Sequence, residues 1–248
     1  YIDIKLKGNS IMKSQLIILD ILANNNWKRP IYFVTGYHND AMGLEEYFQL
    51  EGIAYRLVPI KSDNKSWLDY GRIDTDILYE NMMNRCVWGG ASDKNVYLDY
   101  NHKRTLTVIK ARSNYARLAK ALAAEGKNEK AIKVLNYCME TIPAEKVPYD
   151  MFIPDIIESY YLAGDTTKAV DLTNKMSSYF FRRLEYFFRQ SQNVMASADY
   201  EIQSAIQFVS KAASFARTYG QKELDNEING KLENYYSRYI RLLQPGAK

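Results

Sequence analysis

The sequence predicts two successive regions, a small α/β region over residues 1–100 and an all-α region over residues 101–248. Short runs of β-branched and aromatic residues in the first region are typical of strands, and helical stretches separate them. From about Thr105 onward, apolar residues recur at helical spacing and almost no strand signal remains. We therefore expect a small, mostly parallel sheet with crossover helices, followed by a stack of helical hairpins.

Alternating strands and helices are predicted within the first sixty residues. Ser10 suits the N-cap of the first helix, and a run of three asparagines from Asn24 ends it. The expected elements in chain order are a strand over 1–6, a helix over 11–23, a strand over 31–35, a helix over 44–50 and a strand over 55–60. This alternation favours parallel pairing with crossover helices.

Between the two regions, we expect a polar loop over 61–69, a helix over 74–83 and a turn over 87–91. Val96–Tyr100 fits either a short strand or an extended linker. Asp74 and Asp76 form an Asp-x-Asp pattern, which in some nucleotide-sugar transferases holds a divalent ion. The pattern is short and precedes a helix, so we favour the alternative that Asp74 caps the helix N-terminus.

The helical region carries a repeated pattern of hairpins. Gly126 and Gly164 mark turns between helices, and a third, less regular hairpin is expected around Gly220. Around the first turn, bulky and small apolar residues follow the spacing of a tetratricopeptide unit: Tyr115, Leu118, Ala119, Leu122, Ala131, Leu135 and Cys138. Around the second turn the corresponding residues are Ile153, Ile156, Ile157, Tyr160, Ala169 and Met176. We therefore predict a tetratricopeptide-like stack, an architecture that presents a concave binding surface.

Positive charge is concentrated at the start of the helical region. The whole chain carries a net charge of +4, whereas the stretch from Lys103 to Lys133 holds nine basic and two acidic residues. We predict a basic face that includes Lys103, Arg104, Lys110, Arg112, Arg117 and Lys120. Such a face suits an anionic partner, although a solvated helix surface with no partner explains the same pattern.

The sequence lacks the motifs of common catalytic and metal centres. His38 and His102 are far apart in the chain, and no zinc spacing, nucleophile elbow or glycine-rich phosphate loop is present. Cys86 and Cys138 are expected to be unpaired thiols, because two cysteines do not make a disulfide scaffold. We expect no cofactor, no metal and no nucleic-acid partner.

A loop after the strand at 31–35 is the best local candidate for ligand binding. In parallel sheets, ligands bind beyond the carboxyl ends of the strands. The polar residues that follow this strand are Thr35, His38, Asn39 and Asp40. A solvated polar loop is the alternative interpretation.

Residues 179–189 are unusually aromatic and are flanked by arginines. Phe180, Leu184 and Phe187 would share one face of a helix. The stretch fits either a helix at a membrane surface or a core helix whose arginines extend to solvent, and we favour the core helix.

Several strings in the first region resemble a known family. They are Asn25-Asn26-Trp27-Lys28-Arg29-Pro30-Ile31-Tyr32-Phe33, Gly43-Leu44-Glu45-Glu46-Tyr47, Leu50-Glu51-Gly52 and Tyr55-Arg56-Leu57-Val58-Pro59. Together they resemble the C-terminal soluble region of large bacterial polytopic membrane proteins, a domain of unknown function. The membrane part of that family is similar to protein O-mannosyltransferases. No catalytic residue is carried over by this resemblance.

The resemblance implies a domain on the periplasmic side of an inner membrane. The chain begins at Tyr1, and we interpret it as a fragment of a longer protein. We expect a non-catalytic accessory domain of a glycosyltransferase-like membrane protein that binds an acceptor protein, a glycan or a partner subunit. The alternatives are a free-standing tetratricopeptide-like adaptor and an enzyme that uses Asp74 and Asp76.

Overall fold

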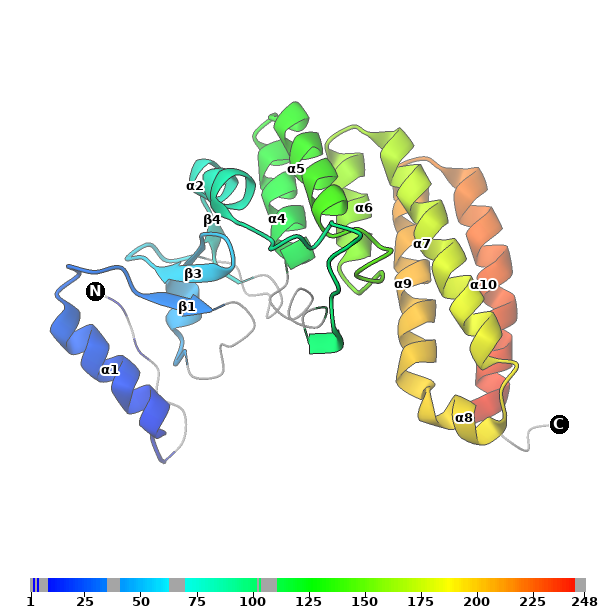
Figure 1. The fold of residues 1–248 in the computed structure, drawn as a ribbon, viewed down its shortest axis with the longest axis horizontal. Helices are drawn as coiled ribbons and strands as arrows, with labels where there is room; N and C mark the ends of the chain where they lie inside the picture. The colour runs from blue at the N-terminus through cyan, green and yellow to red at the C-terminus, as the bar shows by residue number, and fades with distance from the viewer. Residues whose placement is uncertain are drawn as a thin grey trace. The chain divides into compact units, whose positions relative to one another are not determined.

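The computed structural model describes residues 2, 4, 9–34, 41–62, 70–101, 103 and 111–243, and Figure 1 shows the chain as a ribbon. Its internal contacts divide it into two compact units, Tyr1–Val147 and Pro148–Lys248. Each unit is described by itself below.

The sheet of the first unit has four short strands in the order β1-β3-β2-β4. They are β1 (Tyr32–Val34), β2 (Phe48–Leu50), β3 (Ala54–Leu57) and β4 (Arg72–Ile73). Strand β3 runs antiparallel to both β1 and β2, and only β2 and β4 pair in parallel. The prediction of a mostly parallel sheet with crossover helices is therefore wrong.

The error arises at the helix predicted over residues 44–50. Only a 3-10 turn forms there, η1 (Leu44–Tyr47), and the chain then extends directly into β2. Gly52 follows with a φ of +115°, a backbone conformation that favours glycine, and the chain returns at once as β3. A connection of three residues leaves no room for a crossover helix, so the two strands pair antiparallel.

One face of this sheet forms a hydrophobic core. Phe48 stacks on Tyr55 with ring centroids 5.4 Å apart, and Tyr55 lies 4.6 Å from the ring of Tyr70. Leu50 and Leu57 point to the same face and are buried. These contacts follow from the alternation of side chains along a strand, which sends every second residue to the core.

The other helical elements whose bounds the described part of the first unit gives are α1 (Lys13–Asn25), α2 (Thr75–Glu80), the π-helical turn η2 (Asn81–Arg85), α4 (Ala111–Ala124) and α5 (Asn128–Thr141). Helix α4 packs against α2, β4 and α5. The boundary predicted between residues 100 and 101 thus falls within the first unit. The strand predicted over residues 1–6 lies largely outside the described residues, and Val96–Tyr100 does not form a strand.

Helix α1 differs from the other long helices because none of its residues is buried. Its sequence is rich in aliphatic residues, and Leu16, Ile17 and Ile21 are about half exposed. Ile17 and Ile21 are about one turn apart on the same face, whereas Leu16 lies about 100° away around the helix, so the exposed aliphatic residues are spread over a broad part of its surface.

The second unit is all helical and consists of α6 (Ile153–Leu162), α7 (Thr166–Phe187), α8 (Gln192–Ser197), α9 (Asp199–Thr218) and α10 (Lys222–Leu243). Helices α6, α7, α9 and α10 lie side by side (Figure 1), with α7 in contact with α6 and α9, and α9 in contact with α10. Phe180 and Leu184 of the aromatic stretch are buried in this unit, which confirms the core interpretation for these two residues.

The predicted helical hairpins are present. The turns at Gly126, Gly164 and Gly220 all have φ between +75° and +85°, where a side chain would be strained. Helix α7 has 22 residues and the short helix α8 follows it, so the hairpins differ in length.

Candidate ligand-binding site

The predicted site residues fall in different places. Thr35, His38, Asn39 and Asp40 lie outside the described residues, and so do Arg104 and Lys110 of the predicted basic face. Lys103 and Lys120 are partly exposed. The remaining two, Arg112 and Arg117, are buried and cannot contribute to a surface.

The burial of these two arginines corrects the prediction of a continuous basic face. The side chain of Arg112 donates hydrogen bonds to the backbone carbonyls of Ile142 and Val147, at 3.0 and 2.6 Å. Arg117 donates to the carbonyls of Tyr70 and Gly71, both at 3.0 Å, and to the Tyr55 hydroxyl at 3.2 Å. These carbonyls lie in irregular segments without a ladder partner, so buried guanidinium groups satisfy them.

The other face of the sheet carries a line of polar side chains. In the strand register, Tyr32 pairs with Arg56, Arg56 pairs with Gln49, and Gln49 pairs with Arg72. Residues that are paired across strands point to the same face of a sheet. We call these four residues together with Glu51, two positions beyond Gln49, the polar row.

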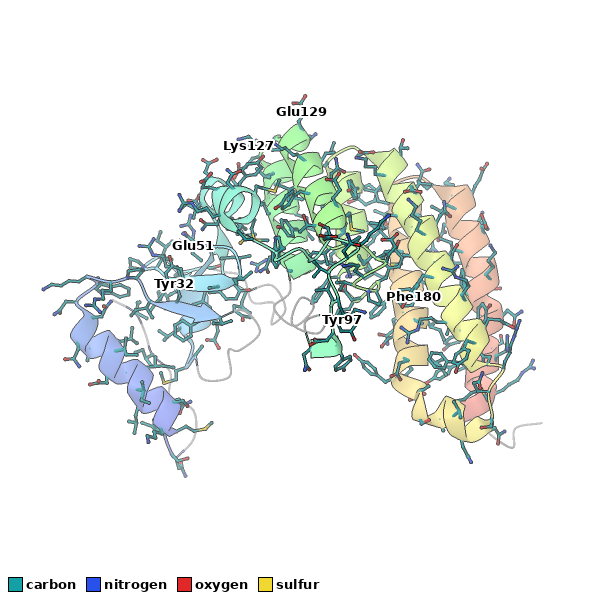
Figure 2. The ribbon with its side chains drawn as sticks, in the orientation of Figure 1. Tyr32, Glu51, Tyr97, Lys127, Glu129 and Phe180 are labelled. Atoms are coloured by element: carbon teal, nitrogen blue, oxygen red, sulfur yellow. The ribbon has the colours of Figure 1, made fainter. Side chains whose placement is uncertain are left out.

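Glu51, which is labelled together with Tyr32 in Figure 2, contacts three other residues of the polar row. Its carboxylate accepts hydrogen bonds from the Tyr32 hydroxyl at 2.9 Å and from the Gln49 amide at 2.6 Å. The Arg56 guanidinium lies 3.7 Å from the same carboxylate, whose side chain is only 5% exposed. Two donors and one cation compensate the cost of burying this charge.

The hairpin turn next to Glu51 is held by two asparagine side chains. Asn81 of η2 donates to the Glu51 carbonyl at 3.1 Å, and Asn114 of α4 donates to the Gly52 carbonyl at 2.8 Å. The turn is thereby fixed to elements that are distant in sequence. This fixes the position of the Glu51 side chain relative to the sheet.

The electrostatics of the polar row favour a neutral tyrosine and a net positive charge. Partial burial, together with the hydrogen bond to Glu51, raises the pKa of the Tyr32 hydroxyl. One glutamate and two arginines give the row a formal charge of +1. Tyr32 is half exposed and the Arg56 side chain is 44% exposed, so part of the row faces solvent.

The Asp-x-Asp pattern has the role that we favoured. The Asp74 carboxylate accepts a hydrogen bond from the backbone N–H of Ile77 at 3.1 Å, and it therefore caps helix α2. Asp76 lies 3.7 Å from the ammonium of Lys127. Among the described residues, no group of histidine, cysteine and acidic side chains is arranged to hold a metal ion.

Neither Cys86 nor Cys138 forms a disulfide, as predicted. Cys138 is buried, and partial burial raises the pKa of Cys86, which lowers its reactivity as a thiolate. In the part of the chain that the structure describes, no helix has the length and apolar character needed to cross a membrane.

The polar row was not predicted from the sequence. Gln49 and Glu51 are two residues apart, a spacing that places both side chains on one face of a strand, but residues 44–50 were predicted to be helical. The neighbours of Arg56 and Arg72 could not be predicted either, because the register between strands decides which side chains lie next to each other.

Residues 1–77 match a family model described as TMEM260-associated domain 2. All of the strings that carry the resemblance, and all five residues of the polar row, lie within this stretch. The match is consistent with an uncharacterised domain of a larger membrane protein. No curated protein matches the chain, and no solved structure does.

Proposed function

We propose that this chain is a non-catalytic binding domain of a larger membrane protein, and that the polar row is its ligand-binding surface. The observation that carries this proposal is the row itself. A half-exposed tyrosine ring on β1 bonds the Glu51 carboxylate, and the Arg56 guanidinium, the Gln49 amide and the Arg72 guanidinium follow it in order on β3, β2 and β4. Aromatic rings next to planar polar groups are suited to polar ligands such as glycans.

The wider proposal follows the family resemblance. The parent would be a glycosyltransferase-like protein, with this domain on the periplasmic side of the inner membrane, where it would bind an acceptor protein, a glycan or a partner subunit. The helical hairpins would form a tetratricopeptide-like stack, and the glycine turns and small residues at the helix contacts support this part of the proposal.

A glycan array with the intact chain tests the binding surface. We expect binding to a subset of glycans, with loss of binding in a Tyr32→Ala variant because the exposed ring is removed. The matched control is Tyr200→Ala, which removes an exposed tyrosine from α9 in the other unit. Unchanged glycan binding in Tyr32→Ala would show that the polar row is not the glycan-binding surface.

Deletion of the domain from the intact parent tests its accessory role. We expect the modification of acceptor proteins to fall when the rest of the parent is still correctly inserted. Unchanged modification would contradict the role. A native protein of about this chain's mass in the soluble fraction would instead favour the free-standing adaptor, for which the helical hairpins are the supporting observation.

A further inference from the structure

The two arginines of the polar row are in different electrostatic environments. Arg56 lies beside the Glu51 carboxylate, whereas Arg72 donates one hydrogen bond, at 2.6 Å, to the neutral amide oxygen of Gln49. Within the described part of the chain, Arg72 makes no ion pair. A guanidinium has five N–H donors, so most of the donors of Arg72 are unused by these residues.

The strand register brings these arginines to the same place on the sheet. Both are paired with Gln49, one from β3 and one from β4, on the same face. Neighbouring strands are about 4.8 Å apart, so their Cα atoms are separated by roughly 10 Å across β2. Two arginine side chains at this spacing are long enough to contact one small anion above Gln49.

Gln49 cannot itself neutralise this charge, and its orientation is fixed. It is almost fully buried, its amide nitrogen donates to Glu51 and its oxygen accepts from Arg72. The carboxylate of Glu51 is occupied by Tyr32, Gln49 and Arg56 on the β1 side of the row. The net positive charge of the polar row therefore lies at Arg72, on β4.

We propose that the polar row binds a phosphate-type oxyanion between Arg56 and Arg72. Guanidinium groups bind phosphate oxygens through paired N–H donors. The Tyr32 ring on the same face of the sheet could contact the organic part of a phosphoester. The inference rests on the proposed binding role of the row and specifies the chemical class of its ligand. Inorganic phosphate, a sugar phosphate and a lipid headgroup share this chemistry.

The inference is tested by titrating the whole chain with inorganic phosphate and with glucose 6-phosphate. Binding is measured by calorimetry and by NMR shifts of the backbone amides of residues 49, 56 and 72. We expect saturable binding that weakens by about tenfold or more in Arg72→Gln, because a charge-assisted contact is lost. Arg72→Lys should recover part of the affinity because the charge is retained. The control Arg85→Gln removes an exposed arginine of η2 and should leave binding unchanged.

Two vesicle samples distinguish the source of the phosphate. Binding to phosphatidylglycerol vesicles but not to phosphatidylcholine vesicles, with the same loss in Arg72→Gln, would identify a lipid headgroup. Equal weakening in Arg72→Gln and Arg85→Gln would overturn the inference, because it would show nonspecific attraction. No anion binding by either phosphate or vesicles would overturn it as well.

The proposed function does not depend on anion binding. If the glycan array shows a neutral glycan that depends on Tyr32, and phosphate adds nothing, the row is a binding surface without an oxyanion site. If Tyr32→Ala leaves the glycan profile unchanged while phosphate binding depends on Arg72, the glycan proposal fails and the oxyanion site stands. The two sets of variants therefore separate the two outcomes.

Discussion

The two compact units differ in the sequence distance that their buried side-chain hydrogen bonds to backbone carbonyls span. In residues 1–147, the buried side chains of Arg112, Asn114 and Arg117 donate to backbone carbonyls that are between 30 and 62 residues distant in sequence. In residues 148–248, the buried hydroxyls of Ser159 and Thr173 donate to carbonyls four residues earlier in the same helix.

This difference follows from the regularity of the backbone. Helices α6, α7, α9 and α10 pair their own amides and carbonyls, so the core of the second unit needs mainly apolar packing. The first unit contains short strands joined by irregular segments, and their free carbonyls need donors from side chains. Long-range polar contacts should therefore dominate stability in the first unit and contribute little in the second.

The largest expected effect comes from Arg117→Met. This change removes donors to Tyr70 and Gly71 and leaves buried acceptors without partners, each costing about 1–3 kcal/mol. We expect the first unit to lose about 4 kcal/mol in unfolding free energy. All three tryptophans precede residue 100, so urea unfolding followed by tryptophan fluorescence reports on this unit.

The control for this prediction is Arg189→Met, in the turn that follows the end of α7. Arg189 is exposed and pairs with Glu185 at 3.0 Å across one helical turn, so its loss should cost less than about 1 kcal/mol. Far-UV circular dichroism measures this variant, because both units contribute helix. Equal losses in the two variants would contradict the proposed difference between the units.

A second pair of variants compares glycine turns in the two units. Gly71 has a φ of +83°, and an added Cβ would lie 2.9 Å from the carbonyl oxygen of Phe48. Gly164 has a φ of +85°, but an added Cβ would meet nothing within 4 Å. Gly164→Ala should cost about 1–2 kcal/mol from backbone strain, and Gly71→Ala about 1–3 kcal/mol more from the clash.

Thermal and urea unfolding of these two alanine variants give the comparison. If Gly71→Ala is no more destabilising than Gly164→Ala, the close approach of Gly71 to β2 is not a constraint on the first unit.

Tyr115→Phe tests a buried hydrogen-bonded hydroxyl of the first unit. The Tyr115 hydroxyl accepts from the Trp88 indole at 2.8 Å and donates to the Met82 carbonyl at 3.1 Å. We expect a loss of about 1–2 kcal/mol at neutral pH. The variant should also lose part of the pH dependence above pH 10.

The sign of that pH dependence follows from the pKa of Tyr115, which burial raises well above its ordinary value of about 10. Below pH 10 the hydroxyl is protonated in both folded and unfolded chains. Above pH 10 the unfolded chain releases a proton that the folded chain retains, so stability falls. Urea unfolding between pH 9 and 11 should show a shallower decline in Tyr115→Phe, and parallel declines would contradict this explanation.

The smallest effect is expected for Ser159→Ala in the second unit. The Ser159 hydroxyl donates to the Asp155 carbonyl at 2.6 Å, and that carbonyl also lies in a helix. Removal of the hydroxyl should change the unfolding free energy by less than about 1 kcal/mol. A loss as large as that of Tyr115→Phe would show that the second unit also depends on buried polar contacts.

The sequence predicted the helical hairpins well because their signals are local. Helical periodicity and a glycine at each turn specify a hairpin without knowledge of the rest of the chain. The cap at Asp74 was predictable for the same reason. Strand β2 was not, since its three residues continue a 3-10 turn and are too few for their alternation to be recognised.

The candidate site could not be predicted because it depends on long-range register. Tyr32, Gln49, Arg56 and Arg72 become neighbours only after the β2–β3 turn is known to be a tight hairpin. The buried arginines were missed because arginine is ordinarily a surface residue. The alanines next to these arginines on α4 allow the helix to pack closely. Only the structure identifies the backbone carbonyls of irregular segments to which the arginines donate.

Helix α1 has a practical consequence for the behaviour of the protein in solution. Thirteen residues without a buried side chain expose Leu16, Ile17 and Ile21 to water. Aliphatic surface of this kind drives self-association, and the net charge of +4 spread over 248 residues gives only weak repulsion against it. We therefore expect this helix to lower the colloidal stability of the purified protein, and a truncated chain that starts at Asn26 should remain monodisperse at higher concentration than the full chain.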